Sequence, residues 1–421
     1  MRKIILLLIL FGITLGTKSQ INRTNAFTRN LEMQKGINWN GLNYGKYFSL
    51  DPEIDMKVIK ERGFQSVRIP VEWDAFVDAS YNIETSFFTE VDKAIQAAIA
   101  NELFPYINIH SWTEISDEPE AYYDEFIHLW EQIATHYSSW SDSLMFEILN
   151  EPAGNLTLEL FNQFQRDALD KIRETNPNRI VLITHAMYSG FQHLPAGDIP
   201  WDANLIYTLH NYSTHEITHQ GADFLGDYAY DFMGTVWSAS EPEFTQMISD
   251  IESVKEFSDS NNIPINIGEF GVFTNAGNNT RYRWLNVMAN LFQNNNFSYA
   301  VWDFGSNIYK ANSNSTDMFT IFKGAWNEPF TSAIIDDAII SSKSNTNLLF
   351  EHDFESGIDP FKLTFWNAVD DRVILTHDNG QAKITVSAET ENDWDAHLTY
   401  DLDSLEVGHY YALSVDLKAD T

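Results

Sequence analysis

Eight short apolar runs alternate with amphipathic stretches over the first three quarters of the chain, and this alternation limits the possible folds more than any other feature. The apolar runs read as buried strands at residues 36–39, 66–71, 104–110, 144–151, 179–185, 205–212, 265–270 and 299–304. Helical periodicity falls between them, at residues 52–62, 89–101, 122–137, 158–175, 243–261 and 281–294. Alternating strands and helices predict a parallel sheet with helices outside it. Eight units of this kind predict a closed (β/α)8 TIM barrel, with a doubly wound open sheet as the alternative.

The texture of the sequence changes after the barrel, which we place at residues 31–340. A polar stretch at residues 341–347 is predicted to be a linker. From 348 to 421, short alternating runs are separated by turn residues and lack a helical period, which predicts a β-sandwich of jelly-roll type. A length of about 75 residues is short of the roughly 100 of a typical sandwich, so we interpret this C-terminal module as truncated.

The N-terminus has the pattern of a secretory signal. Arg2 and Lys3 precede an apolar run at residues 4–15, and small and polar residues follow it. We therefore expect a signal peptide at residues 1–19 and a secreted protein, either extracellular or periplasmic. The apolar run is too short for a spanning helix, so no membrane anchor is expected.

Charge and cysteine content exclude several kinds of partner. The net charge is −34 with a pI near 4.5, and such a chain repels nucleic acids and anionic membranes. A neutral polymer is compatible with it. The absence of Cys excludes disulfides and thiolate metal sites. We expect no cofactor and no metal, and a monomer.

Polar and aromatic residues stand at the carboxyl ends of most of the predicted strands. Because these ends meet at one mouth of a barrel, we expect the side chains to converge. They are Arg68, His110, Asn150, Glu151, His210, Tyr212, Glu269 and Trp302. Two carboxylates from different strands, Glu151 and Glu269, provide what glycoside hydrolysis needs: one protonated acid and one ionised nucleophile.

Aromatic side chains near the strand ends give sugar rings an apolar face to stack on. Trp302 is one such residue. Trp73 and Trp112, which follow the second and third strands, are candidates for further sugar platforms.

These motifs resemble the glycoside hydrolase family 5 cellulases over residues 35–330. The resemblance lies in Ser66-Val-Arg68-Ile-Pro70, Ile107-Asn-Ile-His110, Phe146-Glu-Ile-Leu-Asn-Glu-Pro152, Leu209-His-Asn-Tyr212, Ile267-Gly-Glu269-Phe-Gly271 and Ala300-Val-Trp302. It implies that Glu151 is the acid/base and Glu269 the nucleophile, and that Arg68 and Tyr212 support the nucleophile. It also implies that His110, Asn150, His210 and Trp302 line the sugar subsite at the cleavage point. Ser111 departs from the pattern, since many relatives carry a second His there.

The activity that this resemblance implies is that of a retaining endo-β-1,4-glucanase acting on a β-glucan. The segment at residues 217–222 is similar to the loop after the sixth strand of family endoglucanases, and the C-terminal module resembles cellulase-associated carbohydrate-binding modules. Two alternatives remain open. One is another β-glycan hydrolase such as a β-mannanase, and the other is a catalytically inactive carbohydrate-binding barrel.

One histidine motif and one further acid are expected to have no part in the chemistry. His215-Glu-Ile-Thr-His219 matches the H-E-x-x-H zinc motif, which works only on a helix. We expect no helix here, since the segment follows a strand and precedes Gly221. Glu147 lies on the same strand as Glu151, roughly 13 Å below it at about 3.3 Å per residue. We interpret Glu147 as a structural carboxylate paired with a base.

Overall fold

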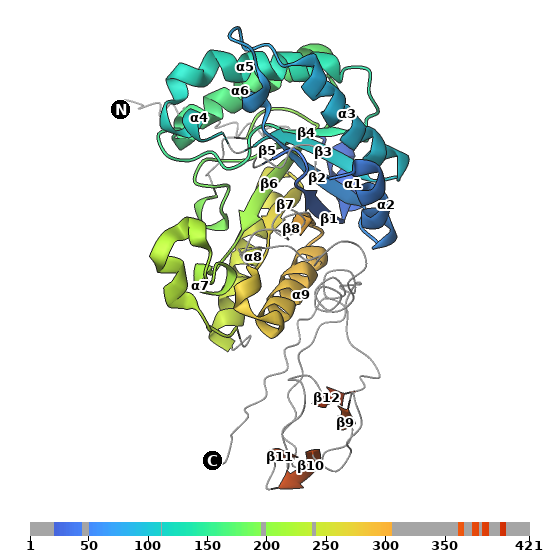
Figure 1. Ribbon diagram of the computed structural model, residues 1–421, viewed down its shortest axis with the longest axis vertical. Coiled ribbons are helices and arrows are strands. Elements are labelled where there is room, and N and C mark those ends of the chain that lie inside the picture. The colour runs from blue at the N-terminus through green and yellow to red at the C-terminus, as the bar shows by residue number, and fades with distance from the viewer. Residues whose placement is uncertain are drawn as a thin grey trace, which may run out of the picture.

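Eight parallel strands form a closed barrel, in which each strand pairs with the next and β8 returns to β1 (Figure 1). The computed structural model describes residues 21–43, 50–110, 112–194, 199–237 and 241–304, and four strands at 361–365, 373–378, 381–386 and 396–400. The barrel strands are β1 (Lys35–Trp39), β2 (Ser66–Val71), β3 (Phe104–Ile109), β4 (Met145–Glu147), β5 (Val181–Ile183), β6 (Leu205–Asn211), β7 (Ile265–Phe270) and β8 (Ser298–Phe304). The predicted TIM barrel is confirmed, and pairing of Lys35 with Tyr299 rules out the open sheet.

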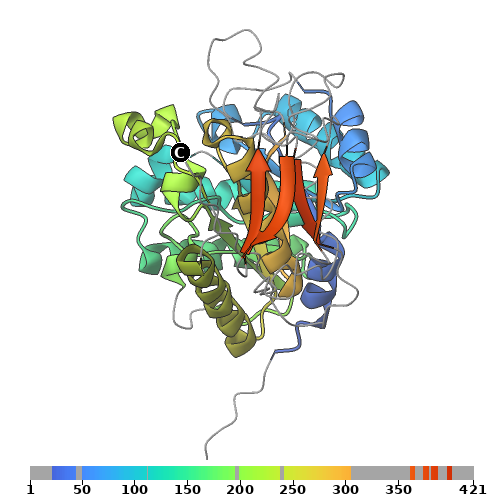
Figure 2. The same ribbon diagram turned by 90° about the horizontal axis from the view of Figure 1, so that it is seen from below.

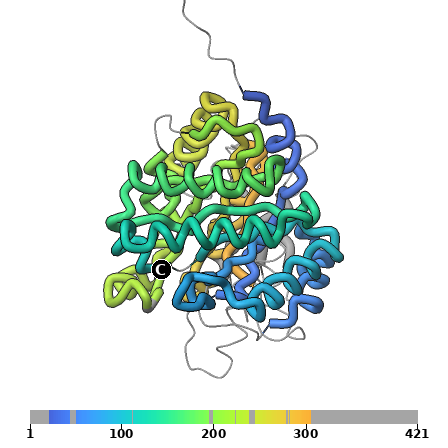
Figure 3. The backbone as a smooth tube through the Cα atoms, turned by 90° about the horizontal axis from the view of Figure 1, so that it is seen from above, coloured from blue at the N-terminus to red at the C-terminus, as the bar shows by residue number. Residues whose placement is uncertain are grey.

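Helices cover the outside of the barrel. Figure 3 shows α5 and α6 side by side, and Figure 2 shows α8 in olive and α9 in gold. The α-helices are α1 (Thr24–Met33), α2 (Pro52–Glu61), α3 (Thr85–Ala100), α4 (Thr113–Asp117), α5 (Pro119–His136), α6 (Leu158–Thr175), α7 (His215–Thr218), α8 (Glu241–Asn261) and α9 (Asn278–Asn294). Short 3-10 helices are η1 (Trp73–Phe76), η2 (Phe191–His193), η3 (Asp223–Phe232) and η4 (Thr274–Ala276). Local signals fix some of these starts: Asp51 caps α2 by accepting from the Glu53 N–H, and Pro52 opens the helix.

Two strands are shorter than the sequence predicts. We expected the fourth at residues 144–151 and the fifth at 179–185, but β4 and β5 have three residues each. Only Phe146 with Val181 and Glu147 with Leu182 pair between them. The strand pairing of β4 ends where its partner β5 ends. Pro152 has no N–H with which to extend it. Asn150 and Glu151 therefore lie just past the strand, where the Asn150 N–H still bonds the carbonyl of Ile109 at 3.0 Å.

The barrel interior has an apolar floor with polar layers above it. Side chains alternate along a strand, so one face of each strand fills the interior. The floor consists of Tyr106, Met145, Leu182, Ile206 and Ala300, packed with Ala26 and Met33 of α1. Arg23, just before α1, holds this layer in place: its guanidinium donates hydrogen bonds to the carbonyls of Pro200 and Asn261. Helix α1 lies outside the helical segments that the sequence predicts.

An irregularity in β7 turns the second carboxylate into the barrel. The register between β6 and β7 shifts after Leu209, so that His210 pairs with Glu269. A bulge of this kind re-aims a side chain. Gly268 makes it possible, because a Cβ there would lie 2.7 Å from Oγ1 of Thr208. Glu269 consequently reaches the interior layer that holds Arg68.

Beyond the barrel, the described residues include two antiparallel strand pairs. β9 (Phe361–Phe365) pairs with β12 (Ala396–Tyr400), and β10 (Val373–Asp378) pairs with β11 (Gln381–Val386). Apart from these four strands, residues 348–421 lie outside the described residues, as do the expected signal peptide and the expected linker. The β-sandwich and the domain boundaries stay predictions. Across the described part of the chain, no helix combines the length and apolar character needed to cross a bilayer.

Candidate active site

Glu151, after β4, and Glu269, on β7, converge at the carboxyl-terminal mouth of the barrel. One oxygen of each carboxylate and a ring nitrogen of His210 all lie within 4.8 Å of one another. The two acids differ in exposure, because the side chain of Glu151 is 30% exposed and that of Glu269 is 7% exposed. The same pair of groups is thus held in two different environments, which is the condition for giving two acids two roles.

Arg68, on β2, is the hub of the buried side of the site. Its guanidinium donates to both oxygens of Glu147, at 2.7 and 2.6 Å, and to Oε1 of Glu269 at 2.6 Å. It also donates to Oδ1 of Asn38 at 3.0 Å and to Oδ1 of Asn150 at 2.7 Å. Burial alone would lower the pKa of Arg68, but the charges of Glu147 and Glu269 raise it. The guanidinium therefore stays charged, and the interpretation of Glu147 as a carboxylate paired with a base is confirmed.

Glu269 receives two hydrogen bonds to its carboxylate, one per oxygen. Arg68 donates to Oε1, and the hydroxyl of Tyr212 donates to Oε2 at 2.9 Å. Burial raises the pKa of Glu269, while His210 and Arg68 counteract part of that rise. Arg68 and Tyr212 thus favour the ionised form in a setting that would otherwise protonate it.

His210 contacts both acids through a single nitrogen. Nδ1 lies 2.6 Å from Oε1 of Glu151 and 3.8 Å from Oε2 of Glu269. Burial alone would lower the pKa of His210, but the two carboxylates outweigh it and raise the pKa. An imidazole in this position can carry a proton between them.

His110 and Trp302 form one wall of the mouth. Their rings are stacked with centroids 5.7 Å apart and an angle of 5° between the planes. Asn108 joins this wall to the buried hub, because its amide nitrogen lies 3.2 Å from Nδ1 of His110 and donates to Glu147. Trp302 belongs to a small apolar cluster that Tyr212 also contacts. The structure therefore brings together all eight strand-end residues selected from the sequence.

The two further platforms expected from the sequence, Trp73 and Trp112, are core residues. Trp73 is fully buried, donates from Nε1 to the carbonyl of Asn108 at 3.1 Å, and packs on Phe87 of α3. Trp112 is 6% exposed, and its ring packs edge-on against Tyr122 of α5. Neither offers a free face to a sugar, so this prediction is wrong. Their position just past strand ends gave a false signal, because the helices that follow fold back over them.

Other aromatic side chains are exposed on the loops that follow β5 and β6, and the sequence analysis did not select them. Tyr188 is 61% exposed, and its N–H donates to the carbonyl of Pro152, the residue after Glu151. Phe224 is 65% exposed, and its ring lies 5.8 Å from that of His219, which in turn lies 5.2 Å from Tyr212. Only their place in loops after strands could have indicated them.

The backbone around Tyr188 explains why that side chain is exposed. Met187, Tyr188 and Ser189 have consecutive positive φ values of 74°, 59° and 56°. Such a run costs free energy for residues with side chains, and it persists only where the surroundings impose it. Here Ser189 accepts a backbone hydrogen bond from the His210 N–H at 2.9 Å, and its hydroxyl donates to the carbonyl of Asn150. The turn is therefore built from the same residues as the site.

The H-E-x-x-H segment does lie on a helix, contrary to our expectation. α7 is a single turn, His215–Thr218, and the His219 N–H bonds the carbonyl of His215 at 2.9 Å. The two rings lie 4.4 Å apart. Burial, with His215 nearby, lowers the pKa of His219 to about 3, so its ring is neutral. Within the described residues, the group of acids and imidazoles close enough to share a cation is Glu151, His210 and Glu269, and it does not include α7.

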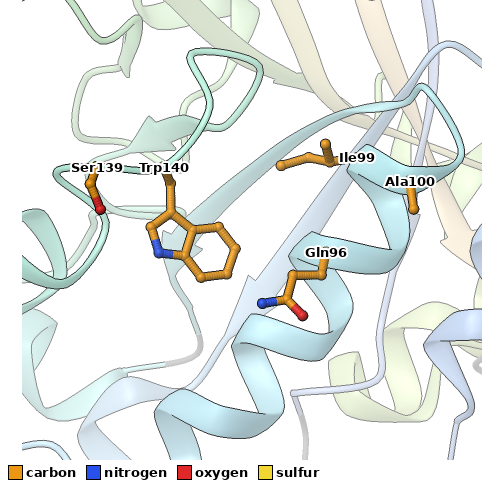
Figure 4. Close-up of a pocket in the computed structure, with 5 residues that line it drawn as sticks. All are labelled: Gln96, Ile99, Ala100, Ser139 and Trp140. Carbon is orange, nitrogen blue, oxygen red and sulfur yellow. The ribbon is translucent and has the colours of Figure 1, made fainter.

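A hollow of about 430 Å³ lies away from the carboxylates (Figure 4). It opens on the outside of the barrel, between the end of α3 and the segment after α5. Its lining consists of Gln96, Ile99, Ala100, Ser139 and Trp140. It contains no acid or base, so it has no part in the chemistry of the mouth.

A (β/α)8 barrel with two neighbouring carboxylates at its mouth, one tied to an arginine and one open to solvent, defines a class of sugar-cleaving barrels. Sequence comparison gives the particular family. A model described as "Cellulase (glycosyl hydrolase family 5)" matches residues 30–308, and the chain belongs to this family.

Individual relatives agree with this assignment. Endoglucanase H of Acetivibrio thermocellus is 33% identical over 248 residues, which are 58% of this chain and 26% of that protein. Endoglucanase B of Ruminococcus albus is 28% identical over 237 residues, which are 52% of this chain and 54% of that protein. The chain thus spans about a quarter and about half of these two relatives. The structure of Thermotoga maritima Cel5A with mannotriose superposes with a TM-score of 0.69 at 31% identity, over 75% of this chain and 99% of that one.

Proposed function

We propose that this protein is a secreted, retaining endo-β-1,4-glucanase. The observation that carries the proposal is the pair Glu151 and Glu269, whose oxygens lie within 4.8 Å across the mouth. Carboxyl groups about 5–5.5 Å apart suit a covalent glycosyl intermediate, whereas inverting enzymes need about 6.5–9.5 Å to place a water. The hydrogen bonds from Arg68 and Tyr212 support Glu269 as the nucleophile, and the greater exposure of Glu151 supports it as the acid/base.

The reaction proceeds in two displacements. In the first, an oxygen of Glu269 attacks the anomeric carbon while Glu151 protonates the departing glycosidic oxygen, so the C–O bond of the polymer breaks as an ester to Glu269 forms. In the second, Glu151 takes a proton from water, and the water oxygen attacks the same carbon and releases Glu269. Each displacement inverts the carbon once, so the product keeps the original configuration.

The buried residues prepare Glu269 for this role. Attack requires the ionised carboxylate, which burial opposes and which Arg68 and Tyr212 favour. In the transition state the negative charge of Glu269 disperses into the new bond. Fixed donors in a water-poor site then act without reorganisation, and this is the main source of electrostatic catalysis.

A neutral glucan is the substrate class that the surroundings favour. A chain of net charge −34 repels acidic polysaccharides. The exposed Tyr188 and Phe224 suit the flat apolar faces of equatorial sugars. Named relatives are endoglucanases, and T. maritima Cel5A has also been solved with cellobiose.

A β-mannanase activity is the second candidate. It is favoured by the complex of T. maritima Cel5A with mannotriose. Glucose and mannose differ at the 2-hydroxyl, and Asn150, held by Arg68, is the residue whose amide would distinguish them. The two activities separate in a comparison of kcat/KM on barley-type β-glucan, carboxymethylcellulose and pure mannan.

Secretion rests on the N-terminal pattern of residues 1–19. Expression of the full chain in a bacterium with a secretion pathway, followed by N-terminal sequencing of the exported protein, tests it. A mature N-terminus near residue 20 supports the proposal, and an intracellular protein that keeps Met1 contradicts it.

The decisive experiment follows the anomer of the first product by NMR immediately after cleavage of a soluble β-glucan. We expect the β-anomer to appear first, and loss of the signal in Glu269→Gln. An α-anomer as the first product would refute the nucleophile role of Glu269. Absence of new reducing ends on every β-glycan tested would favour the inactive carbohydrate-binding barrel.

A further inference from the structure

The guanidinium of Arg68 is divided between two buried carboxylates on different strands. Glu147 of β4 takes two parallel hydrogen bonds, at 2.7 and 2.6 Å, and Glu269 of β7 takes one at 2.6 Å. The side chains of Arg68 and Glu147 are 0% and 1% exposed, so water does not screen them. The same cation therefore serves a carboxylate that the reaction uses and another that it does not touch.

The two parallel hydrogen bonds from Arg68 to Glu147, called the fork below, set the orientation of the guanidinium. Two parallel N–H···O bonds fix the plane of a guanidinium as well as its position. Arg68 presents Nε and Nη2 to Glu147, which leaves Nη1 for Glu269 and Asn38. Without the fork, Asn38 and Asn150 would still bond the guanidinium, but its plane would no longer be fixed by two parallel bonds.

Glu147 also changes the electrostatic potential at Glu269, because it carries a negative charge. The other titratable groups around this cluster are Glu151, His210, Tyr106 and Tyr212, together with His110, which Asn108 joins to Glu147. Among them only the two imidazoles can add positive charge, whereas Glu147, Glu151 and Glu269 are all acids. The negative charge of Glu147 therefore cancels part of the positive charge that Arg68 offers to Glu269.

We propose that Glu147 is a positioning residue for the reaction: it holds Arg68 in contact with Glu269 and moderates the positive charge that Glu269 experiences. The inference rests on the proposed role of Glu269 as nucleophile. It assigns to Glu147 a function beyond that of a structural ion pair. The two parts of this function, position and charge, are separable by substitution.

Glu147→Gln removes the charge and keeps the shape. The ionised form of Glu269 then loses a repulsive neighbour, so the acid limb of kcat/KM moves to lower pH. One of the two fork bonds is also lost, because the amide nitrogen of Gln cannot accept from Arg68. We expect kcat at the optimum to fall about tenfold.

Glu147→Asp retains the charge and shortens the side chain. It should lower kcat about tenfold, because the fork no longer reaches, and its acid limb should not move below that of the wild type. This variant also carries the test if the Gln variant fails to fold. Asp55→Asn is the matched control, since Asp55 is 2% exposed, bonds Trp39 and contacts none of these residues. Its acid limb should coincide with that of the wild type.

The test is a pH profile of kcat/KM on a soluble β-glucan for the wild type, the three variants and Glu269→Gln, with folding checked by near-UV circular dichroism. A downward shift in Glu147→Gln alone supports the proposal. A Gln profile with an unchanged or raised acid limb overturns it, as does full kcat in Glu147→Asp. An active Glu269→Gln would instead refute the proposed function, so the two failures are distinguishable.

Discussion

His210 bridges the two acids of the mouth from one ring nitrogen, with Nδ1 2.6 Å from Oε1 of Glu151 and 3.8 Å from Oε2 of Glu269. His210 is 3% exposed, and its ring lies over Gly268, where a Cβ would stand 3.3 Å from Nε2. A side chain at position 268 would therefore press against this ring. The ring therefore lies next to Glu151, the proposed proton donor, and close to Glu269.

The two acids should fail in different ways when their charge is removed. Glu269→Gln removes the proposed nucleophile, and Glu151→Gln removes the proposed proton donor, so each should lower kcat on polymer by about 10²–10⁴. Glu151→Gln should keep fast glycosylation on an aryl cellobioside with a good leaving group, because that step needs no protonation. Burst kinetics of aryl release measure the difference.

Azide provides the matched control for this pair. It replaces the water that Glu151 would activate and should restore turnover in Glu151→Gln as a glycosyl azide, while Glu269→Gln should not respond in the same manner. If either variant keeps full activity on polymer, the assignment of the pair fails.

Tyr212→Phe should move the acid limb of kcat/KM upward. The phenol donates to Oε2 of Glu269 at 2.9 Å, and a hydrogen bond to the ionised form favours that form. Its loss raises the pKa of Glu269 further, so a higher pH is needed to ionise the nucleophile. A charge-assisted bond of about 1.5–3 kcal/mol corresponds to a shift of roughly one to two units. A limb at or below the wild-type pH would show that Tyr212 does not support the carboxylate.

Catalysis should persist after exhaustive chelation. Glu151, His210 and Glu269 are close enough to hold a cation, but Arg68 already occupies Oε1 of Glu269 with a positive charge. Dialysis against EDTA, followed by a reducing-sugar assay, checks this. Activity that disappears and returns with zinc, in a barrel that stays folded, would contradict the two-carboxylate mechanism. A substitution of His215 on α7 should have no effect on metal content.

Tyr188→Ala should weaken binding of the polymer on the leaving-group side. The side chain is 61% exposed beside the loop of Glu151, and a stacked sugar would lose about 1 kcal/mol or more, which raises KM roughly fivefold or more. Trp201→Ala is the control, because Trp201 is 70% exposed but precedes β6, at the opposite end of the barrel. An aryl cellobioside, which carries an aryl group in place of any sugar beyond the cleaved bond, should show wild-type kinetics in both variants. Unchanged KM on polymer would remove Tyr188 from the cleft.

The sequence predicts the barrel well because strand-helix alternation is a local pattern that eight units repeat. It predicts the acids for the same reason: Asn150-Glu151-Pro152 and Gly268-Glu269 stand at strand ends. The sequence does not predict strand length, because β4 ends where its pairing with β5 ends. That limit belongs to two strands together and is invisible in either run alone.

The exposure of aromatic side chains likewise depends on distant parts of the chain and not on the local sequence. Trp73 and Tyr188 both follow strands, yet the helix α3 buries Trp73 and a left-handed turn exposes Tyr188. Positive φ values in Met187 and Ser189 have no local sequence signal, because hydrogen bonds from distant residues impose them. The single helical turn α7 is likewise too short for periodicity to reveal.

The bonds of Arg68 join β2, β4 and β7, which are far apart along the chain and meet only when β8 has closed on β1. Before closure, Arg68 and Glu269 have no common interior in which to interact. A fragment that contains half or three quarters of the barrel should therefore have no residual activity. The rate of regain of activity after dilution from denaturant therefore reports the completion of the ring itself, later than any signal from helix formation.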